Sequence, residues 1–421
     1  MRDTVLARET ARTYQPPKFT PHIVADQLRD GYWLDAPDIN RNSRPDLIGY
    51  GLSVGEIYWY QNPDWTRHLV VDKVKMPVGM DCGDITGNGY PDLVLCYDLY
   101  GPGGTLRDPD PEGGKIDWIE NPGNPANSER RWKRHYIGHT VATHRLKIGH
   151  FTQTQRLEVL GLPIVAMADM HALLPVVLFT QPDDVLNAKE WPMTIVDDSS
   201  FRMIHGVTKK EGLLPGSRLD SVLLASDEGI TWLYYDEAVR RWSKIPIGVG
   251  ELTQFAQTGF KGSSDLDVGR IGDDPFAYVA AIEPFHGNTV AVYCKEGKRA
   301  ASEAQWRRVL LDVYGDPNEG GEGPGHCVMC RDFDGDGEDE FLVGLRGPWP
   351  WQGVMYYKAI DIKNGVFTKW RVSDESVARI AVADFSGHGR LDFATIAYSV
   401  QHYYVAKDAK IMLYRNEIEA H

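Results

Sequence analysis

The chain has 421 residues, 42% of them hydrophobic and 25% charged, so it is long and apolar enough to bury a large core. Its 45 basic and 59 acidic residues give a net charge of -14, which disfavours nucleic acid and anionic membrane surfaces as partners. Residues 1–18 lack the apolar run of a secretion signal, and no window approaches the roughly 18 apolar residues that span a membrane, so we expect a cytoplasmic protein.

An acidic, glycine-containing turn recurs along the chain. Its clearest copy runs from Asp332 to Glu340 between two short apolar segments, a pattern typical of a β-hairpin. Related strings lie at residues 38–46, 84–92 and 384–392, with a degenerate copy at 150–158. The repetition indicates that the chain is built from similar units rather than from several unrelated domains.

A second repeated phrase is an aromatic residue followed five positions later by Ile, Val or Leu. Its copies lie 46 to 67 residues apart and begin at Phe19, Trp65, Trp132, Trp191, Trp242, Trp306 and Phe367. Periods of this size in strand-rich sequence are typical of propeller blades, each with four strands. We therefore predict an all-β fold, a seven-bladed β-propeller.

The two ends of the chain complement each other. The last repeat supplies three strands, ending at residues 410–416, and lacks a fourth, whereas Phe19–Val24 reads as a fourth strand without a blade. Pairing the two would close the ring and remove an exposed sheet edge. We expect an N-terminal extension over residues 1–18 and a single propeller over residues 19–421.

Propeller geometry predicts which side chains share one funnel at the ring axis. The first residue of each innermost strand and the loops between the second and third strands should lie on the same face. The strand starts are Trp33, His144, His205, His326 and Arg379. The loops contribute, among others, Tyr50, Asp98, Tyr100, Glu283, His286, Arg346, Trp351, Tyr398 and Tyr403.

Three of these strand-start residues are histidines. His144, His205 and His326 come from different blades and could present three imidazole nitrogens to one divalent ion, such as Mg²⁺, Zn²⁺, Mn²⁺ or Ca²⁺, with coordination positions left open. Histidines bonded to backbone carbonyls are the alternative. The surrounding aromatic side chains suit a sugar, whose C–H faces stack on such rings.

A second cation site is predicted in the clearest acidic turn. Carboxylates at alternate positions, with glycines that allow tight bends, could hold a structural Ca²⁺ or Mg²⁺. The four residues are Asp332, Asp334, Asp336 and Glu340. A charged turn without a metal is the alternative.

Several strings resemble a known family. Among them are Gly31-Tyr-Trp33, Asp98-x-Tyr-Gly101, His144-Arg-Leu-Lys147 and Phe285-His-Gly-Asn-Thr-Val290. They are similar to the N-terminal propeller of fungal aldos-2-ulose dehydratase/isomerase, over nearly the whole chain, and the acidic turns resemble FG-GAP/VCBS-like repeats. The resemblance implies a seven-bladed propeller with a catalytic metal that dehydrates keto-sugars such as 1,5-anhydrofructose.

The resulting hypothesis is a metal-dependent carbon–oxygen lyase, with a small sugar as partner and a homodimer left open. Elimination needs a base, an electrophile and an acid. We expect the metal on His144, His205 and His326 to be the electrophile, with His144 matched to the family motif. His286 is the expected base, and Tyr398 or Tyr403 the acid. Substrate contacts are expected from Trp33, Tyr50, Asp98, Tyr100, Glu283, Arg379 and Trp351.

Two other functions fit the same sequence. One is a polysaccharide lyase that cleaves uronate-containing glycans, including rhamnose-glucuronate end groups, by the same elimination with a glycosidic oxygen as leaving group. The other is a non-enzymatic propeller that binds carbohydrate or protein, for which the funnel histidines would be incidental.

Overall fold

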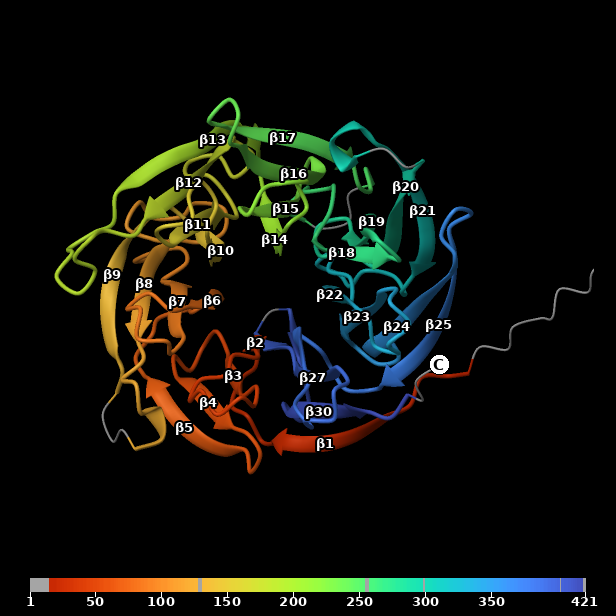
Figure 1. Ribbon diagram of the computed structural model, residues 1–421, viewed down its shortest axis with the longest axis horizontal. Helices are drawn as coiled ribbons and strands as arrows, with labels where there is room; N and C mark the ends of the chain where they lie inside the picture. The colour runs from red at the N-terminus through yellow and green to blue at the C-terminus, as the bar shows by residue number, and fades with distance from the viewer. Residues whose placement is uncertain (1–14, 128–130, 254–256, 298–299, 402, 419–421) are drawn as a thin grey trace, which may run out of the picture.

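The computed structural model describes residues 15–127, 131–253, 257–297, 300–401 and 403–418. Within those ranges the chain folds into seven four-stranded antiparallel sheets and one two-stranded sheet, arranged as a ring (Figure 1). The prediction of an all-β, seven-bladed propeller is confirmed. Residues 1–14 of the expected N-terminal extension lie outside the described part.

The first four blades follow one another along the chain. Blade 1 has β2 (Trp33–Asp35), β3 (Leu47–Tyr50), β4 (Ile57–Gln61) and β5 (Thr66–Val71). Blade 2 has β6 (Gly79–Gly83), β7 (Asp92–Tyr97), β8 (Lys115–Glu120) and β9 (Lys133–His139). Blade 3 has β10 (Thr143–Gly149), β11 (Glu158–Pro163), β12 (Leu174–Thr180) and β13 (Met193–Phe201). Blade 4 has β14 (Ile204–Glu211), β15 (Asp220–Ser226), β16 (Gly229–Asp236) and β17 (Arg241–Gly248).

The remaining blades complete the ring. Blade 5 has β18 (Asp265–Ile271), β19 (Asp274–Glu283), β20 (Thr289–Glu296) and β21 (Gln305–Val313). Blade 6 has β22 (Gly325–Arg331), β23 (Glu340–Arg346), β24 (Gln352–Asp361) and β25 (Val366–Ser373). Blade 7 has β26 (Arg379–Ala383), β27 (Asp392–Ile396), β30 (Ile411–Asn416) and β1 (Phe19–Ala25). Outside the blades lie β28 (Ser399–Val400), β29 (Tyr404–Val405) and the short 3₁₀ helices η1 (Pro125–Asn127) and η2 (Ala301–Glu303).

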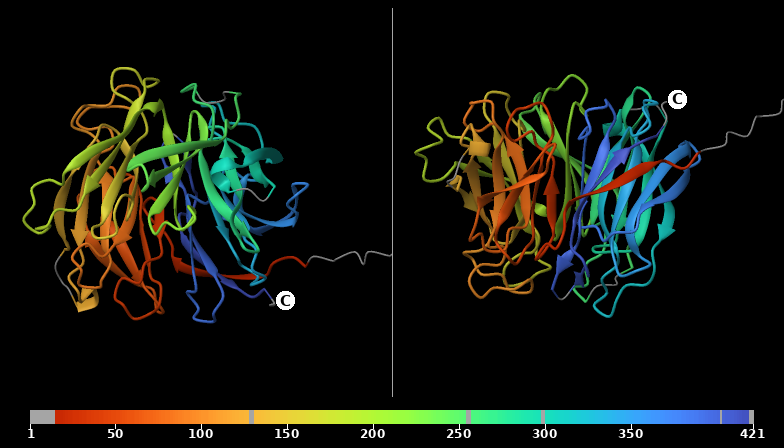
Figure 2. Two further views of the ribbon diagram at one scale, coloured as in Figure 1. Left: turned by 45° about the horizontal axis from the view of Figure 1, so that its top comes forward. Right: turned by 90° about the horizontal axis from the view of Figure 1, so that it is seen from below.

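Ring closure occurs in blade 7, as the sequence predicts. Strand β1 pairs antiparallel with β30, with Phe19 opposite Asn416, and so supplies the outer strand that the last repeat lacks. Seen from the side, β1 runs along the outside of the ring beside the C-terminal strands (Figure 2). The pairing removes the open edge that β30 would otherwise present.

Burial follows strand position within each blade. The second strands, such as β7 and β23, are buried along almost their whole length, because both of their faces pack against neighbouring blades. Outer strands such as β13 are largely exposed. The innermost strands β2, β6, β10, β14, β18 and β22 lie closest to the centre in Figure 1. Residues that begin these strands therefore meet near the axis.

The acidic turns bind neighbouring blades together. In blade 2, the Asp92 carboxylate accepts the backbone N–H groups of Ile85 and Asn121. The Asn121 side chain then donates to the carbonyl of Ile39 in blade 1, at 3.0 Å. Equivalent bonds run from Asn62 to Phe385 and from Asn416 to Phe333. Each amide satisfies a carbonyl of the adjacent blade, which fixes how the blades stack.

Two further observations concern the cysteines and the helices. All five cysteines lie within the described residues, and none forms a disulfide. The two helices assigned in the described ranges are single 3₁₀ turns, and neither has the length or apolar character to cross a membrane.

Removing one inter-blade amide should weaken the ring. Asn121→Ala leaves the buried carbonyl of Ile39 without this partner, so we expect a loss of about 1–3 kcal/mol in the free energy of unfolding. Urea denaturation measures it. Asn364→Ala, which removes a local and exposed contact with Asp361, is the matched control. Equal stability of the two variants would contradict a role for Asn121 in joining the blades.

Candidate metal centre

Three histidines sit at irregularities in the innermost strands. The ladder between β10 and β11 shifts register between Thr143 and Arg145, so His144 is left unpaired. The same shift occurs at His205 in β14 and at His326 in β22. Such bulges redirect a side chain from the plane of its sheet. Blades 3, 4 and 6, which differ in sequence, thus use the same bulge to turn a histidine out of its ladder.

The described residues that could hold a metal at the axis are His205, His286 and His326. One ring nitrogen of each lies within 4.8 Å of the others, and all three side chains are buried. The Nε2 atoms of His205 and His286 are 3.1 Å apart. His144 lies beside this group, with its ring 5.1 Å from that of His205, but is not part of it. The expected set therefore changes by one residue: His286, expected as the base, stands where His144 was expected.

The hydrogen bonds of these rings determine where their protons lie. His205 Nδ1 donates to the carbonyl of Ser264 at 2.8 Å, and His326 Nδ1 donates to the carbonyl of Ala378 at 2.6 Å. His286 Nδ1 lies 2.5 Å from the carboxylate of Glu322. Because a carbonyl or carboxylate oxygen accepts, each Nδ1 carries the proton and each Nε2 carries a lone pair. Fixing the tautomer in this way is what oxygen partners do behind metal-bound histidines.

No hydrogen-bond donor among the described residues satisfies the Nε2 lone pairs of all three histidines. His326 Nε2 is fully buried and makes no hydrogen bond within the described residues. Burial lowers the pKa of His205 and of His326 well below the ordinary value, and it lowers the pKa of His286 as well. At neutral pH the rings are therefore uncharged, and the Nε2 atoms of His205 and His286 face each other without a proton between them. The donor set fits a divalent cation.

His286 is held from several sides. It lies in the loop between β19 and β20 with a φ of 48°, a left-handed conformation that is uncommon outside glycine. Its backbone N–H donates to Ser264 Oγ at 3.2 Å, and its ring stacks on Phe285 at 4.1 Å. Ser264 thus contacts two members of the histidine group. The strained backbone conformation is of the kind that persists where surrounding contacts enforce it.

Glu322 links the histidine group to a buried arginine. Its carboxylate accepts from Arg346 Nη2 at 2.7 Å while contacting His286. Burial opposes ionisation of Glu322, but His286 and Arg346 outweigh it and lower the pKa of its carboxyl to about 2. Arg346 also donates to the hydroxyl of Tyr398 at 3.2 Å. One buried network therefore joins His286 to a phenol.

His144 occupies a different environment from the other histidines. Arg145 Nη1 lies 3.0 Å from its Nε2, and the Tyr32 hydroxyl lies 3.2 Å from the same nitrogen. Burial, followed by the charge of Arg145, lowers the pKa of His144 well below its ordinary value. Since the guanidinium donates to Nε2, the ring proton sits on Nδ1, which is buried without a partner. His144 is thus a neutral N–H donor beside the group.

Aromatic and cationic side chains surround the histidines. The Tyr398 ring lies 4.8 Å from His326, and the Tyr403 ring 5.7 Å from His286. Trp33 packs against the guanidinium of Arg379 at 4.9 Å. Tyr50 lies parallel to Trp33 at 6.4 Å. Most of the aromatic residues predicted for the funnel are therefore close to the axis.

Three side chains predicted to contact the substrate are bonded to, or packed on, residues away from the histidine group. Asp98 is paired with Lys75 at 2.6 Å and Lys115 at 2.9 Å; burial opposes its ionisation, but the two ammonium groups outweigh it and lower its pKa. The fully buried Glu283 accepts from Tyr293 at 2.5 Å and from Arg308 at 2.7 Å. Trp351 is 37% exposed and packs on Tyr314. No described contact joins these three side chains to the histidine group.

Tyr100 is the remaining predicted contact. It follows β7 in a loop, and burial raises the pKa of its phenol well above the ordinary value, with the phenols of Tyr403, Tyr32 and Tyr398 as further contributors. Its hydroxyl is therefore protonated over the whole neutral range.

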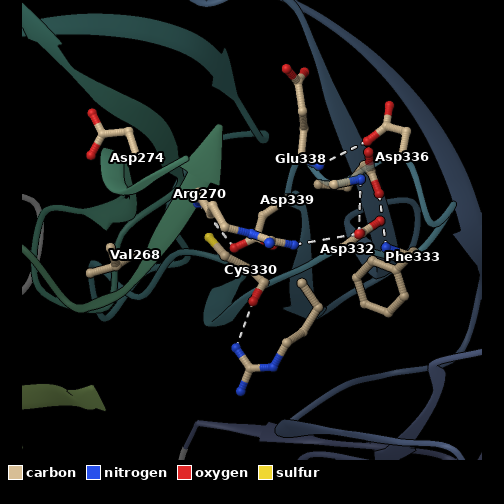
Figure 3. Close-up of polar contacts among 12 residues, drawn as sticks. Val268, Arg270, Asp274, Cys330, Asp332, Phe333, Asp336, Glu338 and Asp339 are labelled. Atoms are coloured by element: carbon tan, nitrogen blue, oxygen red, sulfur yellow. Dashed lines mark hydrogen bonds and ion pairs between the residues drawn. The ribbon is translucent and has the colours of Figure 1, made fainter. Parts of the chain in front are cut away.

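The carboxylates of the clearest acidic turn are paired with a lysine from another strand of the blade. Asp332, Asp334 and Asp336 each present an oxygen within 4.8 Å of the others, the spacing expected of a cation site. However, the ammonium of Lys358 contacts Asp334 and lies 2.8 Å from Asp336 and 2.9 Å from Glu340. Asp332 faces Arg270 at 3.5 Å, as Figure 3 shows. Lys358 lies 18 positions beyond Glu340 in the sequence, so the turn pattern does not predict its contact with the turn.

Three residues of the centre, Tyr32, Arg145 and Glu322, are not among the residues predicted for the funnel. Tyr32 and Arg145 adjoin predicted residues, and the Gly31-Tyr-Trp33 and His144-Arg strings contain them. Arg346 is predicted for the funnel from its position after the second strand, but its burial and its pairing with Glu322 are not. Glu322 lies in the segment between β21 and β22, which carries no repeat pattern. Only the fold brings Glu322 to His286.

Comparisons with known proteins point to one family. Residues 113–296 match the family model of the aldos-2-ulose dehydratase β-propeller domain. The chain is 36% identical over 425 aligned positions to aldos-2-ulose dehydratase of Phanerodontia chrysosporium, covering 94% of this chain and 46% of that protein. The chain thus spans about half the length of this relative.

Solved structures share the fold at low sequence identity. A crystal structure of BBS1N in complex with ARL6DN, soaked with mercury, matches with a TM-score of 0.53 and 11% identity, covering 96% of this chain and 98% of that chain. The β-propeller domain of Cps50 (Swd1) from Myceliophteria thermophila matches with a TM-score of 0.51 and 9% identity, covering 93% and 99%. These two show the fold alone. The resemblance of this chain to the propeller domain of aldos-2-ulose dehydratase is confirmed, across nearly its whole length.

Proposed function

We propose that the chain is a metal-dependent carbon–oxygen lyase that dehydrates a keto-sugar, such as 1,5-anhydrofructose or an aldos-2-ulose. The observation that carries the proposal is the convergence of three proton-free Nε2 atoms, from His205, His286 and His326, in a buried site. The relative named as a dehydratase supports it, although that protein is about twice as long. The expected cytoplasmic location and homodimer stay predictions.

The metal would be held by His205, His286 and His326. Three imidazoles favour zinc over magnesium or calcium, which prefer oxygen ligands. When bound, such an ion supplies a Lewis acid that polarises a carbonyl oxygen. This assignment replaces the base role that the sequence suggested for His286 with a ligand role, secured by Glu322 behind it.

Elimination of water also needs two proton transfers. The base takes the proton from the carbon next to the carbonyl, the carbonyl oxygen gains the negative charge, and the neighbouring C–O bond breaks as the acid protonates the departing hydroxyl. Burial raises the pKa of both Tyr398 and Tyr403, and Arg346 opposes this shift at Tyr398, to whose hydroxyl it donates, so we assign the base to Tyr398. Tyr403 is the acid, since burial raises its pKa and its hydroxyl has no hydrogen bond within the described residues.

The other axial side chains would orient the sugar. His144 offers a buried N–H with no partner, suited to hold a substrate oxygen. The rings of Trp33 and Tyr403 provide apolar faces for the C–H groups of a pyranose. Tyr32 and Arg145 fix the tautomer of His144 in the way that Glu322 fixes that of His286.

A uronate lyase is the second candidate, and one observation favours it. Arg145 is 1% exposed and has no carboxylate within ion-pair distance among the described residues. A uronate carboxylate would satisfy that buried charge. Parallel assays on 1,5-anhydrofructose and gum arabic, followed by the absorbance of an unsaturated product, separate the two functions. Activity on the polysaccharide alone would replace the keto-sugar assignment.

Removing the metal should abolish turnover. Dialysis against EDTA is expected to lower kcat by about 100-fold or more, and adding zinc should restore it. The measurement is the absorbance of the unsaturated product, with metal content determined on the same samples. Full activity in protein shown to be free of metal would contradict the proposal.

The axial site and the acidic turn should fail in different ways. His326 lies near the start of β22 and Asp332 follows its end, about 20 Å away at ~3.3 Å per residue. His326→Ala should remove activity with little change in Tm. Asp334→Ala leaves Lys358 with one carboxylate fewer and should cost about 1–3 kcal/mol of stability while turnover is kept. An active His326→Ala beside a folded but inactive Asp334→Ala would place the active site on the other face.

Glu322 provides a test of how His286 is held. Glu322→Gln keeps the side chain's size but removes its charge, so we expect metal affinity to fall by about 10–100-fold. Competition with a chromogenic chelator measures the affinity, and Glu319→Gln in the same segment is the control. Unchanged affinity in Glu322→Gln would show that the carboxylate does not position His286.

A further inference from the structure

A cavity of about 260 Å³ lies between the closing blade and blade 1, apart from the histidine group. Its walls come from the segment that links β1 to β2, from β3, β4 and β5 of blade 1, and from Ile396 of β27. In Figure 1 these elements meet where β1 reaches the outer strand of blade 1. The cavity therefore lies at the junction between the first and last blades of the ring.

Two contacts hold the linking segment over blade 1. The Asp30 carboxylate accepts the backbone N–H groups of Ser53 and Val54, at 2.7 and 2.9 Å. Arg29 pairs with Glu56. A Cβ at Gly51 would meet the Asp30 carboxylate at 2.1 Å, so glycine is required where the two segments cross. These contacts hold the cavity walls in place without a ligand.

One phenol of the cavity lacks a partner. Tyr60 is 2% exposed, and its hydroxyl makes no hydrogen bond within the described residues. Burial raises the pKa of this phenol, so it is a donor at neutral pH. The Tyr50 phenol points the other way, toward Trp33 and Arg145 near the axis. The cavity therefore contains one donor that an acceptor-bearing molecule would satisfy.

The charges around the cavity balance. Arg29 and Arg67 oppose Asp30 and Glu56, and the Arg67 guanidinium lies over the Tyr58 ring at 4.7 Å. In the β4–β5 ladder Arg67 is directly opposite Tyr60, so its donors and the phenol share one face. The volume would hold roughly nine waters at about 30 Å³ each, the space of one hydroxylated six-membered ring.

We propose that this cavity is a binding site for a neutral pyranose, separate from the axial site. Its hydroxyls would accept from the Tyr60 phenol and from Arg67, and its C–H face would lie on the tyrosine rings of β4. Because the ligand would touch both the linking segment and blade 1, it would stabilise the closed ring. The inference does not depend on the proposed lyase activity.

Isothermal titration with 1,5-anhydroglucitol tests the site. This pyranose has no carbonyl and so cannot undergo the proposed elimination. We expect saturable binding to the intact chain, weakened about tenfold or more by Tyr60→Phe and by Arg67→Ala, each of which removes a donor. Arg44→Ala, an exposed position elsewhere in blade 1, and His326→Ala in the axial site should bind as the unmodified chain does. Melting curves of each variant check that it folds.

Three results would overturn the proposal. One is the absence of saturable binding to the intact chain. Another is binding that His326→Ala abolishes and both cavity variants retain, which would place the sugar at the axis. The third is tighter binding of glucuronate than of 1,5-anhydroglucitol, which would show that the cavity prefers an anion.

Discussion

Pairing of β1 with β30 holds the structure in a ring, and the rest of the molecule depends on that closure. Histidines from blades 4, 5 and 6 meet because each blade is held at a fixed angle to the next. Asp267 of blade 5 joins all three blades, since its carboxylate accepts from Thr208 of blade 4 and from the backbone N–H of Cys330 of blade 6. An open chain of blades would separate the histidines. The metal centre is thus a property of the closed ring, since no single blade contains more than one of His205, His286 and His326.

The electrostatics of the axis follow from burial. Desolvation keeps the histidines neutral, as metal ligands must be, and carbonyl or carboxylate partners fix their tautomers. Three arginines, Arg145, Arg346 and Arg379, are also buried nearby, and the acidic groups that face them are Glu322 and, at 3.7 Å from Arg379, Asp265. A positively charged, water-poor pocket stabilises negative charge that develops on a substrate oxygen. This suits elimination next to a carbonyl.

The architecture could be predicted from the sequence because each sequence repeat corresponds to one four-stranded blade. The aromatic phrase located the outer strands, and the missing strand of the last repeat predicted the closure by Phe19–Val24, which β1 confirms. His205 and His326 could be placed near the axis because they begin innermost strands. The acidic turns could be located for the same reason.

What the sequence could not predict depends on contacts between distant segments. Glu322 lies outside every repeat, and Lys358 sits on β24, so no spacing relates them to His286 or to Asp334. His144 and His326 occupy the same position in their blades, yet Arg145 and Tyr32 bind His144 and leave His326 Nε2 free. The position in a strand determines where a side chain starts, whereas residues from other parts of the chain determine which hydrogen bonds its polar atoms make.

The central claim is that one cation binds to the Nε2 atoms of His205, His286 and His326. Anomalous diffraction from a crystal grown with zinc, collected on both sides of the zinc absorption edge, tests it most directly. The account predicts an anomalous peak bonded to all three nitrogens, with His144 outside the coordination sphere. A peak on His144, or a peak confined to the acidic turn with none at the axis, would contradict it.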